Sequence, residues 1–84
     1  MNKYKLLQKA WTKPNNMRFA EIVSLAECMG FRLSRVSGSH HIFVHPSVSE
    51  LLNLQNKRGK AKSYQISQFL ALVEKYNLDQ GEQP

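Results

Sequence analysis

Three stretches of the chain carry apolar residues at the spacing of an amphipathic helix, about residues 3–12, 18–29 and 63–76. In the first, Tyr4, Leu7 and Trp11 recur at i, i+3, i+7 and lead the predicted apolar stripe, which Leu6 and Ala10 widen. The apolar positions are Phe19, Ile22, Val23, Ala26 and Met29 in the second helix, and Ile66, Phe69, Leu70 and Val73 in the third. Pro14 stops the first helix, and Gly30 suits the position just after the second.

The hydrophobic period changes to two after Gly30. Residues 31–36 alternate as a strand does, and Ser37-Gly38-Ser39 is turn chemistry. Residues 40–45 resume as a strand rich in Ile, Phe and Val, so the two segments predict an antiparallel hairpin. Residues 51–55 are a candidate third strand, although a Leu-rich run also forms helices well.

The predicted order is helix, helix, three strands, helix, which is typical of an α+β domain with helices on one face of a small antiparallel sheet. A chain of 84 residues forms one domain with a modest core, and a hydrophobic fraction of 42 % is enough for it to fold. The last residues, 79–84, are polar and predict a frayed tail.

The charge of the chain favours an anionic partner, because 12 Lys and Arg stand against 6 acidic residues and give a net charge of +6. RNA, DNA and an acidic protein all fit, and the alternative is a basic surface kept for solubility alone. The single cysteine, Cys28, excludes an internal disulfide and fits a reducing compartment. No run approaches a membrane span and no secretion signal is evident, so we expect a cytoplasmic protein without membrane association.

All three histidines lie within residues 40–45, at the start of a predicted strand. Histidine both takes and gives a proton near neutral pH, and His40 follows Gly38 closely enough to be presented at the end of the sheet. The alternative is a surface histidine of no consequence. A metal site is disfavoured, because neighbouring His40 and His41 point to opposite faces and His41 and His45 are ~13 Å apart along a strand.

Residues 56–62 form a predicted loop that carries four cations and no acid, namely Lys57, Arg58, Lys60 and Lys62. Flexible cations bind a phosphate backbone without reading bases, so the loop fits phosphate binding, with a solvated linker as the equal alternative. Arg32 and Arg35 could add phosphate contacts. Three aromatic residues could stack on bases or pack in the core: Trp11, Phe31 and Phe43.

These features together resemble a known family. The chain has an amphipathic helix ending in Gly-Phe, then Arg-x-x-Gly-Ser-His-His-x-Phe over residues 35–43, a third strand and a closing helix. This pattern is similar to the HicA-type toxins of bacterial toxin–antitoxin modules, which are small mRNA interferases. The resemblance covers about residues 18–78, which leaves residues 1–17 as an N-terminal helical extension and 79–84 as a tail.

The resemblance implies a double-stranded-RNA-binding-domain-like α-β-β-β-α fold, with a three-stranded antiparallel sheet and helices on one face, preceded here by an extra short helix. It implies RNA cleavage without a metal or other cofactor. The catalytic histidine of the family is the first after Gly-Ser, which here is His40. The implied partners are mRNA and a HicB-type antitoxin that covers the active site, and we expect no DNA binding by this chain alone.

We therefore expect a toxin that is an endoribonuclease, with His40 as general acid or base and the ribose 2′-OH as internal nucleophile. The expected RNA-binding residues are Arg35, Ser39, Lys57, Arg58, Lys60 and Lys62. The second proton-transfer group stays open among His41, His45 and Lys60. Alternative functions are a non-catalytic RNA-binding module of the same fold and a basic adaptor for an acidic protein.

If Phe43 faces the helices, alternation along the strand places Ile42 and Val44 beside His40 on the open face of the sheet. An acidic antitoxin docked on that face would bury both side chains.

Overall fold

The computed structural model describes residues 2–79, so residues 80–84 of the expected polar tail lie outside the described part. The elements are α1 (Lys3–Thr12), a 3-10 turn η1 (Pro14–Asn16), α2 (Phe19–Cys28), β1 (Arg32–Ser37), β2 (His40–His45), β3 (Val48–Gln55) and α3 (Ser63–Tyr76). The strands form one antiparallel sheet in the order β1-β2-β3. The predicted α+β class and element order are confirmed, and the third strand is longer than predicted.

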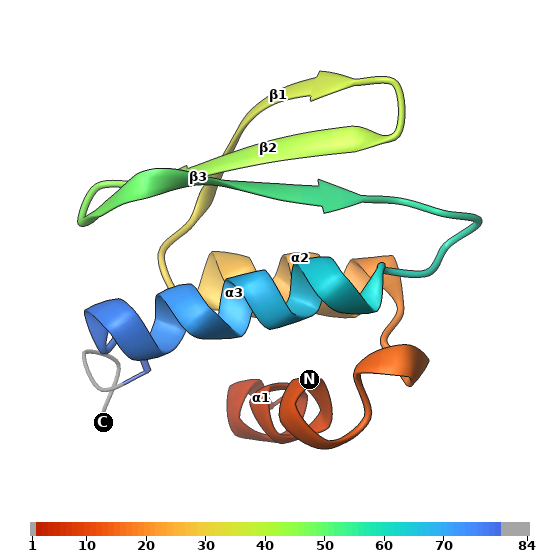
Figure 1. Ribbon diagram of the computed structural model, residues 1–84, viewed down its shortest axis with the longest axis horizontal. Coiled ribbons are helices and arrows are strands. Elements are labelled where there is room, and N and C mark those ends of the chain that lie inside the picture. The colour runs from red at the N-terminus through yellow and green to blue at the C-terminus, as the bar shows by residue number, and fades with distance from the viewer. Residues whose placement is uncertain (1, 80–84) are drawn as a thin grey trace.

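The chain folds into three layers (Figure 1). The sheet covers one side of α2 and α3, and α1 packs on the other side of this helix pair. Within residues 2–79, every helix is too short or too polar to cross a membrane.

The core lies between the sheet and the helices. Phe43 at the centre of β2 is 1 % exposed and Phe69 on α3 is fully buried. Phe31 bridges the two layers, since its ring centroid is 5.9 Å from that of Phe69. Each of these side chains removes enough apolar area from water to contribute about 2–3 kcal/mol, so this cluster holds the sheet on the helices.

Helix α1 belongs to the same core, but with a different face from the one predicted. Leu6 and Ala10 are each 1 % exposed, whereas Tyr4 and Trp11 are 45 % and 50 % exposed. The i, i+4 pair of moderate and small side chains lets α1 approach α2 and α3 closely, and this leaves the larger aromatic rings outside. The prediction that Tyr4 and Trp11 lead the buried stripe was therefore wrong.

An ion pair ties α1 to the start of α2. Lys9 Nζ lies 2.9 Å from Glu21 Oε1, and the same carboxylate accepts a hydrogen bond from the Arg18 backbone N–H at 2.9 Å. The backbone hydrogen bond from Arg18 and then the Lys9 ammonium group lower the pKa of Glu21. The carboxylate thus caps α2 while it holds α1 against it.

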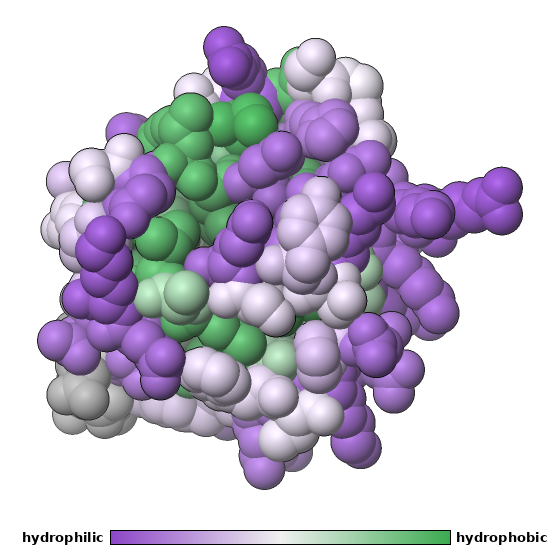
Figure 2. All heavy atoms as spheres, in the orientation of Figure 1, coloured by the Kyte–Doolittle hydropathy of each residue, from purple (hydrophilic) through white to green (hydrophobic). Residues whose placement is uncertain are grey.

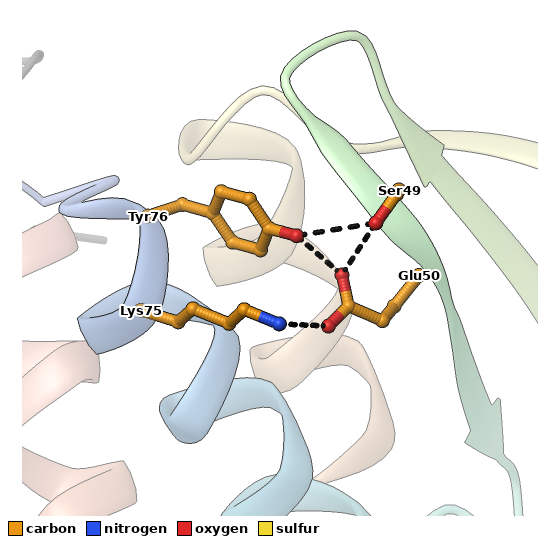
Figure 3. Close-up of polar contacts among 4 residues, drawn as sticks. All are labelled: Ser49, Glu50, Lys75 and Tyr76. Carbon is orange, nitrogen blue, oxygen red and sulfur yellow. Dashed lines mark hydrogen bonds and ion pairs between the residues drawn. The ribbon is translucent and has the colours of Figure 1, made fainter.

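A second polar cluster joins the beginning of β3 to the end of α3 (Figure 3). Glu50 accepts hydrogen bonds from Lys75 Nζ at 2.8 Å, Tyr76 Oη at 2.6 Å and Ser49 Oγ at 3.1 Å. These donors, Lys75 first and Tyr76 second, lower the pKa of Glu50 to about 2. The cluster lies at the opposite end of β3 from His40, which pairs with Gln55.

The lowered pKa of Glu50 predicts a loss of stability in acid. The stabilising effect of the ionised carboxylate is complete above the usual value of 4.5 and is lost as the pH falls through about 2. In that window the unfolded chain binds more protons than the folded one. We expect the free energy of unfolding, measured by denaturant titration at a series of pH values, to fall between about pH 4.5 and 2.

Glu50→Gln should flatten this fall. The matched control is Glu27→Gln, an exposed glutamate on α2 whose side chain has no ion pair or hydrogen bond among residues 2–79. An equal slope in wild type and Glu50→Gln would contradict the assignment.

Candidate functional site

The burial of Phe43 shows which face of β2 is directed toward the helices. Because strand residues alternate, His41 and His45 point toward the helix layer, while His40, Ile42 and Val44 lie on the open face. The expectation that Ile42 and Val44 flank His40 agrees with this arrangement. Both are only partly buried, so the open face carries apolar side chains around a single imidazole.

His45 has a structural environment. Its Nδ1 accepts a hydrogen bond from the Ser47 backbone N–H at 3.0 Å, and its Nε2 donates to the Met29 carbonyl at 2.9 Å. The ring packs edge-on against Phe31, with centroids 4.9 Å apart. A Cβ on Gly30 would lie 2.7 Å from His45 Nε2, so glycine leaves room for the ring. Both nitrogens are occupied, and His45 is not free to exchange protons with a substrate.

His41 lies at the junction between the hairpin turn and the start of α2. Its Nδ1 donates to the Ser39 carbonyl at 3.2 Å, since a carbonyl only accepts, and its ring centroid is 4.7 Å from that of Phe19. Its Nε2 is left without a protein partner among the described residues. Because neighbouring strand residues alternate and its ring contacts Phe19, His41 points away from the face that carries His40.

His40 is half-buried and is held by Asn53 of β3, whose Oδ1 lies 3.2 Å from His40 Nδ1. Because the amide oxygen only accepts, Nδ1 of the neutral ring carries the proton, and Nε2 has no hydrogen-bond partner within residues 2–79. A partner that fixes the tautomer and orientation of a histidine is what acid–base catalysis needs. Asn53 was not predictable from the sequence, because its place beside His40 depends on the register of β2 and β3, in which Asn53 pairs with Ile42.

A β-bulge in β1 brings two arginines to the face of His40. Arg32 pairs with Val44 and Arg35 pairs with Ile42, with a register shift between Leu33 and Arg35. Directly paired residues share a face, so both arginines lie on the open side of the sheet. Strict alternation would have separated them, and the position of the bulge was not predictable from the residue pattern.

The predicted RNA-binding residue Ser39 is in the hairpin turn and contributes its backbone to the fold. Its carbonyl accepts hydrogen bonds from His41 Nδ1 and from the Asn56 backbone N–H, the latter at 2.9 Å. The second bond joins the turn that precedes His40 to the beginning of the basic loop, residues 56–62. The two predicted parts of the site are therefore connected through Ser39.

The four loop cations line one open cavity of about 660 Å³, the basic cavity. Its lining residues are Asn15, Lys57, Arg58, Lys60, Ala61, Lys62, Ser63 and Tyr64. Hydrophilic side chains crowd this side of the molecule, where β3 runs into α3 (Figure 2). His40 does not line the cavity, so the structure groups the loop cations with one another and leaves the imidazole on a separate surface nearby.

Two of the three aromatic residues considered for base stacking are inaccessible. Phe31 and Phe43 are 2 % and 1 % exposed, and Trp11 lies on α1, away from the strand that carries His40. The described part of the chain contains no group of three or more His, Cys, Asp and Glu side chains that could hold a metal ion.

Comparison with known proteins gives one match. The family model described as the HicA toxin of bacterial toxin–antitoxin systems matches residues 19–72, from the start of α2 into α3. No match was found among curated proteins or solved structures. The matched segment contains His40, Asn53 and all four cations of the basic loop.

The contrasting environments of His40 and His45 predict that the loss of stability on substitution is larger at His45 than at His40. His45→Ala leaves the Met29 carbonyl and the Ser47 N–H without their partner and should lower the free energy of unfolding by about 1–3 kcal/mol. His40→Ala should cost less than about 1 kcal/mol, because the ring is half-exposed and has one long hydrogen bond. Denaturant unfolding of both variants measures this, and the reverse order would contradict the assignment.

Proposed function

The chain belongs to the HicA toxin family of bacterial toxin–antitoxin modules, and on this premise we propose that it is an endoribonuclease that cleaves mRNA and is inhibited by a cognate HicB-type antitoxin. The cytoplasm, where mRNA is translated, is the proposed site of action. The observation that carries the proposal is the imidazole of His40, which is half-exposed on the open face of the sheet and held by Asn53. Its Nε2 has no partner among residues 2–79.

In the proposed reaction His40 Nε2 accepts the proton of a ribose 2′-OH. The resulting oxygen attacks the adjacent phosphorus, the bond from phosphorus to the 5′-oxygen breaks, and the leaving oxygen takes up a proton. The products are a 2′,3′-cyclic phosphate and a 5′-hydroxyl, and no metal ion enters the chemistry. Asn53 keeps the proton of His40 on Nδ1 and so directs the basic nitrogen outward.

The arginines of β1 have the proposed role of offsetting negative charge at the phosphate. Arg35 pairs with Ile42, which on its other side pairs with Asn53, the residue that holds His40. Arg32 lies further along the same face. Fixed cations near a developing charge lower the barrier most where water is partly excluded. Ser39 and the loop cations Lys57, Arg58, Lys60 and Lys62 are the proposed contacts for the flanking RNA.

Fewer residues are suited to be the second proton-transfer group than the sequence left open. His45 is unsuited to this role because both of its ring nitrogens are engaged. His41 points toward the helix layer and Lys60 lines the basic cavity, so either would act only on RNA that bends around the end of the sheet.

The proposed antitoxin surface is the open face of the sheet. Ile42 and Val44 are partly buried and Leu51 is 61 % exposed there, and the arginines of β1 border them. An acidic antitoxin would cover these apolar side chains, pair with the arginines and block His40 in one interface.

His40→Ala should abolish both growth arrest and cleavage of single-stranded RNA in the presence of EDTA. Asn53→Ala should retain cleavage at a rate ~10- to 100-fold lower, because the imidazole remains but its tautomer and orientation are no longer fixed. Gel analysis of end-labelled RNA measures the rates and detects the 2′,3′-cyclic phosphate end.

The comparison variant is His41→Ala, which removes the adjacent imidazole from the other face of the strand and should lower cleavage less than His40→Ala does. Retarded but uncut RNA with the wild-type protein would favour the non-catalytic RNA-binding module instead. Equal loss of cleavage in His40→Ala and His41→Ala would contradict the separate roles of the two faces.

Ile42→Asp should weaken the complex with the antitoxin by about 1–3 kcal/mol, because it places a charge in an apolar contact beside His40. The free protein should keep its stability, since Ile42 is only partly buried. Leu33→Asp is the matched control, an exposed apolar residue of β1 that pairs with Phe43 and so belongs to the other face. Unfolding of free Ile42→Asp, or equal weakening by Leu33→Asp, would contradict the proposed interface.

A further inference from the structure

The basic cavity contains an exposed aromatic ring that the proposed chemistry at His40 does not use. Tyr64, in the first turn of α3, is 56 % exposed and lines the cavity together with the four loop cations. An exposed aromatic ring beside clustered cations offers a ligand a flat stacking surface and positive charge at one place. The same pair of features binds single-stranded nucleic acid, in which bases stack on aromatic rings and phosphates pair with cations.

The wall of the cavity is an ordered turn. Lys57 and Lys60 exchange two backbone hydrogen bonds of 2.9 and 3.0 Å, and Asn56 Oδ1 accepts from the Gly59 N–H at 2.8 Å. The Gly59 carbonyl in turn accepts from the Phe19 N–H at 2.9 Å, which fixes the turn to the start of α2. These bonds give the backbone that carries the cations a defined turn, which argues against the solvated linker that the sequence left open.

Arg58 occupies a backbone position that does not favour it. Its φ of 54° and that of Gly59, 84°, place both residues in the left-handed region, as in a two-residue type I′ turn. Asn-Gly is the preferred pair for such a turn, and an arginine there carries a conformational cost. Residues held in an unfavourable backbone conformation cluster at ligand-binding sites. Arg58 fits this pattern, because its side chain lines the cavity.

A long hydrogen bond links Tyr64 to a buried glutamine. Gln65 is 2 % exposed, its Oε1 accepts from the Gln55 N–H at 2.7 Å, and its Nε2 donates to Tyr64 Oη at 3.4 Å. Gln55 is the cross-strand partner of His40. The Tyr64 ring is thereby joined through Gln65 to the end of the sheet that carries the imidazole.

We propose that this cavity binds one unpaired nucleotide of the RNA, with its base stacked on Tyr64 and its phosphates on Lys57, Arg58, Lys60 and Lys62. A base can stack there only when it is out of a duplex, so the substrate class is single-stranded RNA. The identity of the ligand as RNA rests on the proposed function, whereas the stacking site rests on the geometry of the cavity.

The test measures binding in the His40→Ala background, so that RNA stays intact, by fluorescence anisotropy with a labelled oligouridine strand and a labelled RNA duplex. Tyr64→Ala and Tyr64→Leu should each weaken binding of the single strand by ~5- to 100-fold and leave binding of the duplex unchanged. Tyr64→Phe keeps the ring and loses the bond to Gln65, and it should bind within ~3-fold of the parent. Tyr4→Ala, another exposed tyrosine on α1, is the matched control.

A second variant tests the wall of the cavity. Arg58→Asn creates the preferred Asn-Gly turn and should raise the melting temperature, while it weakens binding of the single strand and lowers the slope of affinity against salt by ~0.7. Unchanged binding by Tyr64→Ala and Tyr64→Leu, or an equal loss for single strand and duplex, would overturn the stacking site. Tyr64-dependent binding without His40-dependent cleavage would leave this inference standing and overturn the ribonuclease proposal instead.

Discussion

The packing of one face of the sheet against α2 and α3 is the constraint on which the rest of the molecule depends. With Phe43 buried among the helices, every other position of β2 is assigned to a face. That assignment separates the three histidines by role. His45 is partly buried and hydrogen-bonded at both nitrogens, His41 lies against Phe19, and His40 is the histidine on the open face. A small core thus decides which imidazole lies on the open face of the sheet.

The parts of the proposed RNA site come from segments far apart in the sequence and are joined by backbone hydrogen bonds. The hairpin turn before His40 is bonded to Asn56, the loop that follows is bonded to the start of α2, and Gln65 bonds the end of β3 to α3. Because these contacts use main-chain groups or a buried amide, the surface side chains remain available for a ligand. The loop backbone that carries the cations is hydrogen-bonded within itself and to the start of α2.

The element order, the boundaries of α1 and α3 and the hairpin followed from hydrophobic periodicity and turn residues, since these signals are local. The buried face of α1 was mispredicted because periodicity does not show whether a neighbouring helix leaves room for Trp11 or only for Ala10. Asn53 was missed because its contact with His40 depends on strand register. The face on which Arg35 lies depends on a bulge, which the residue pattern does not show. Tyr64 was not predicted as a site residue because it joins the site only through the cavity that it lines with Arg58 and Lys60.

The most direct test of the account is the nitrogen NMR spectrum of the three imidazoles, with and without a single-stranded RNA blocked by 2′-O-methyl groups. The structure predicts protons on Nδ1 of His40 and on Nε2 of His45 in the free protein. Addition of the RNA should change the Nε2 signal of His40 and leave both signals of His45 in place. A response confined to His41 or His45, or a free His40 with its proton on Nε2, would contradict the claim that the fold presents His40 as the reacting base.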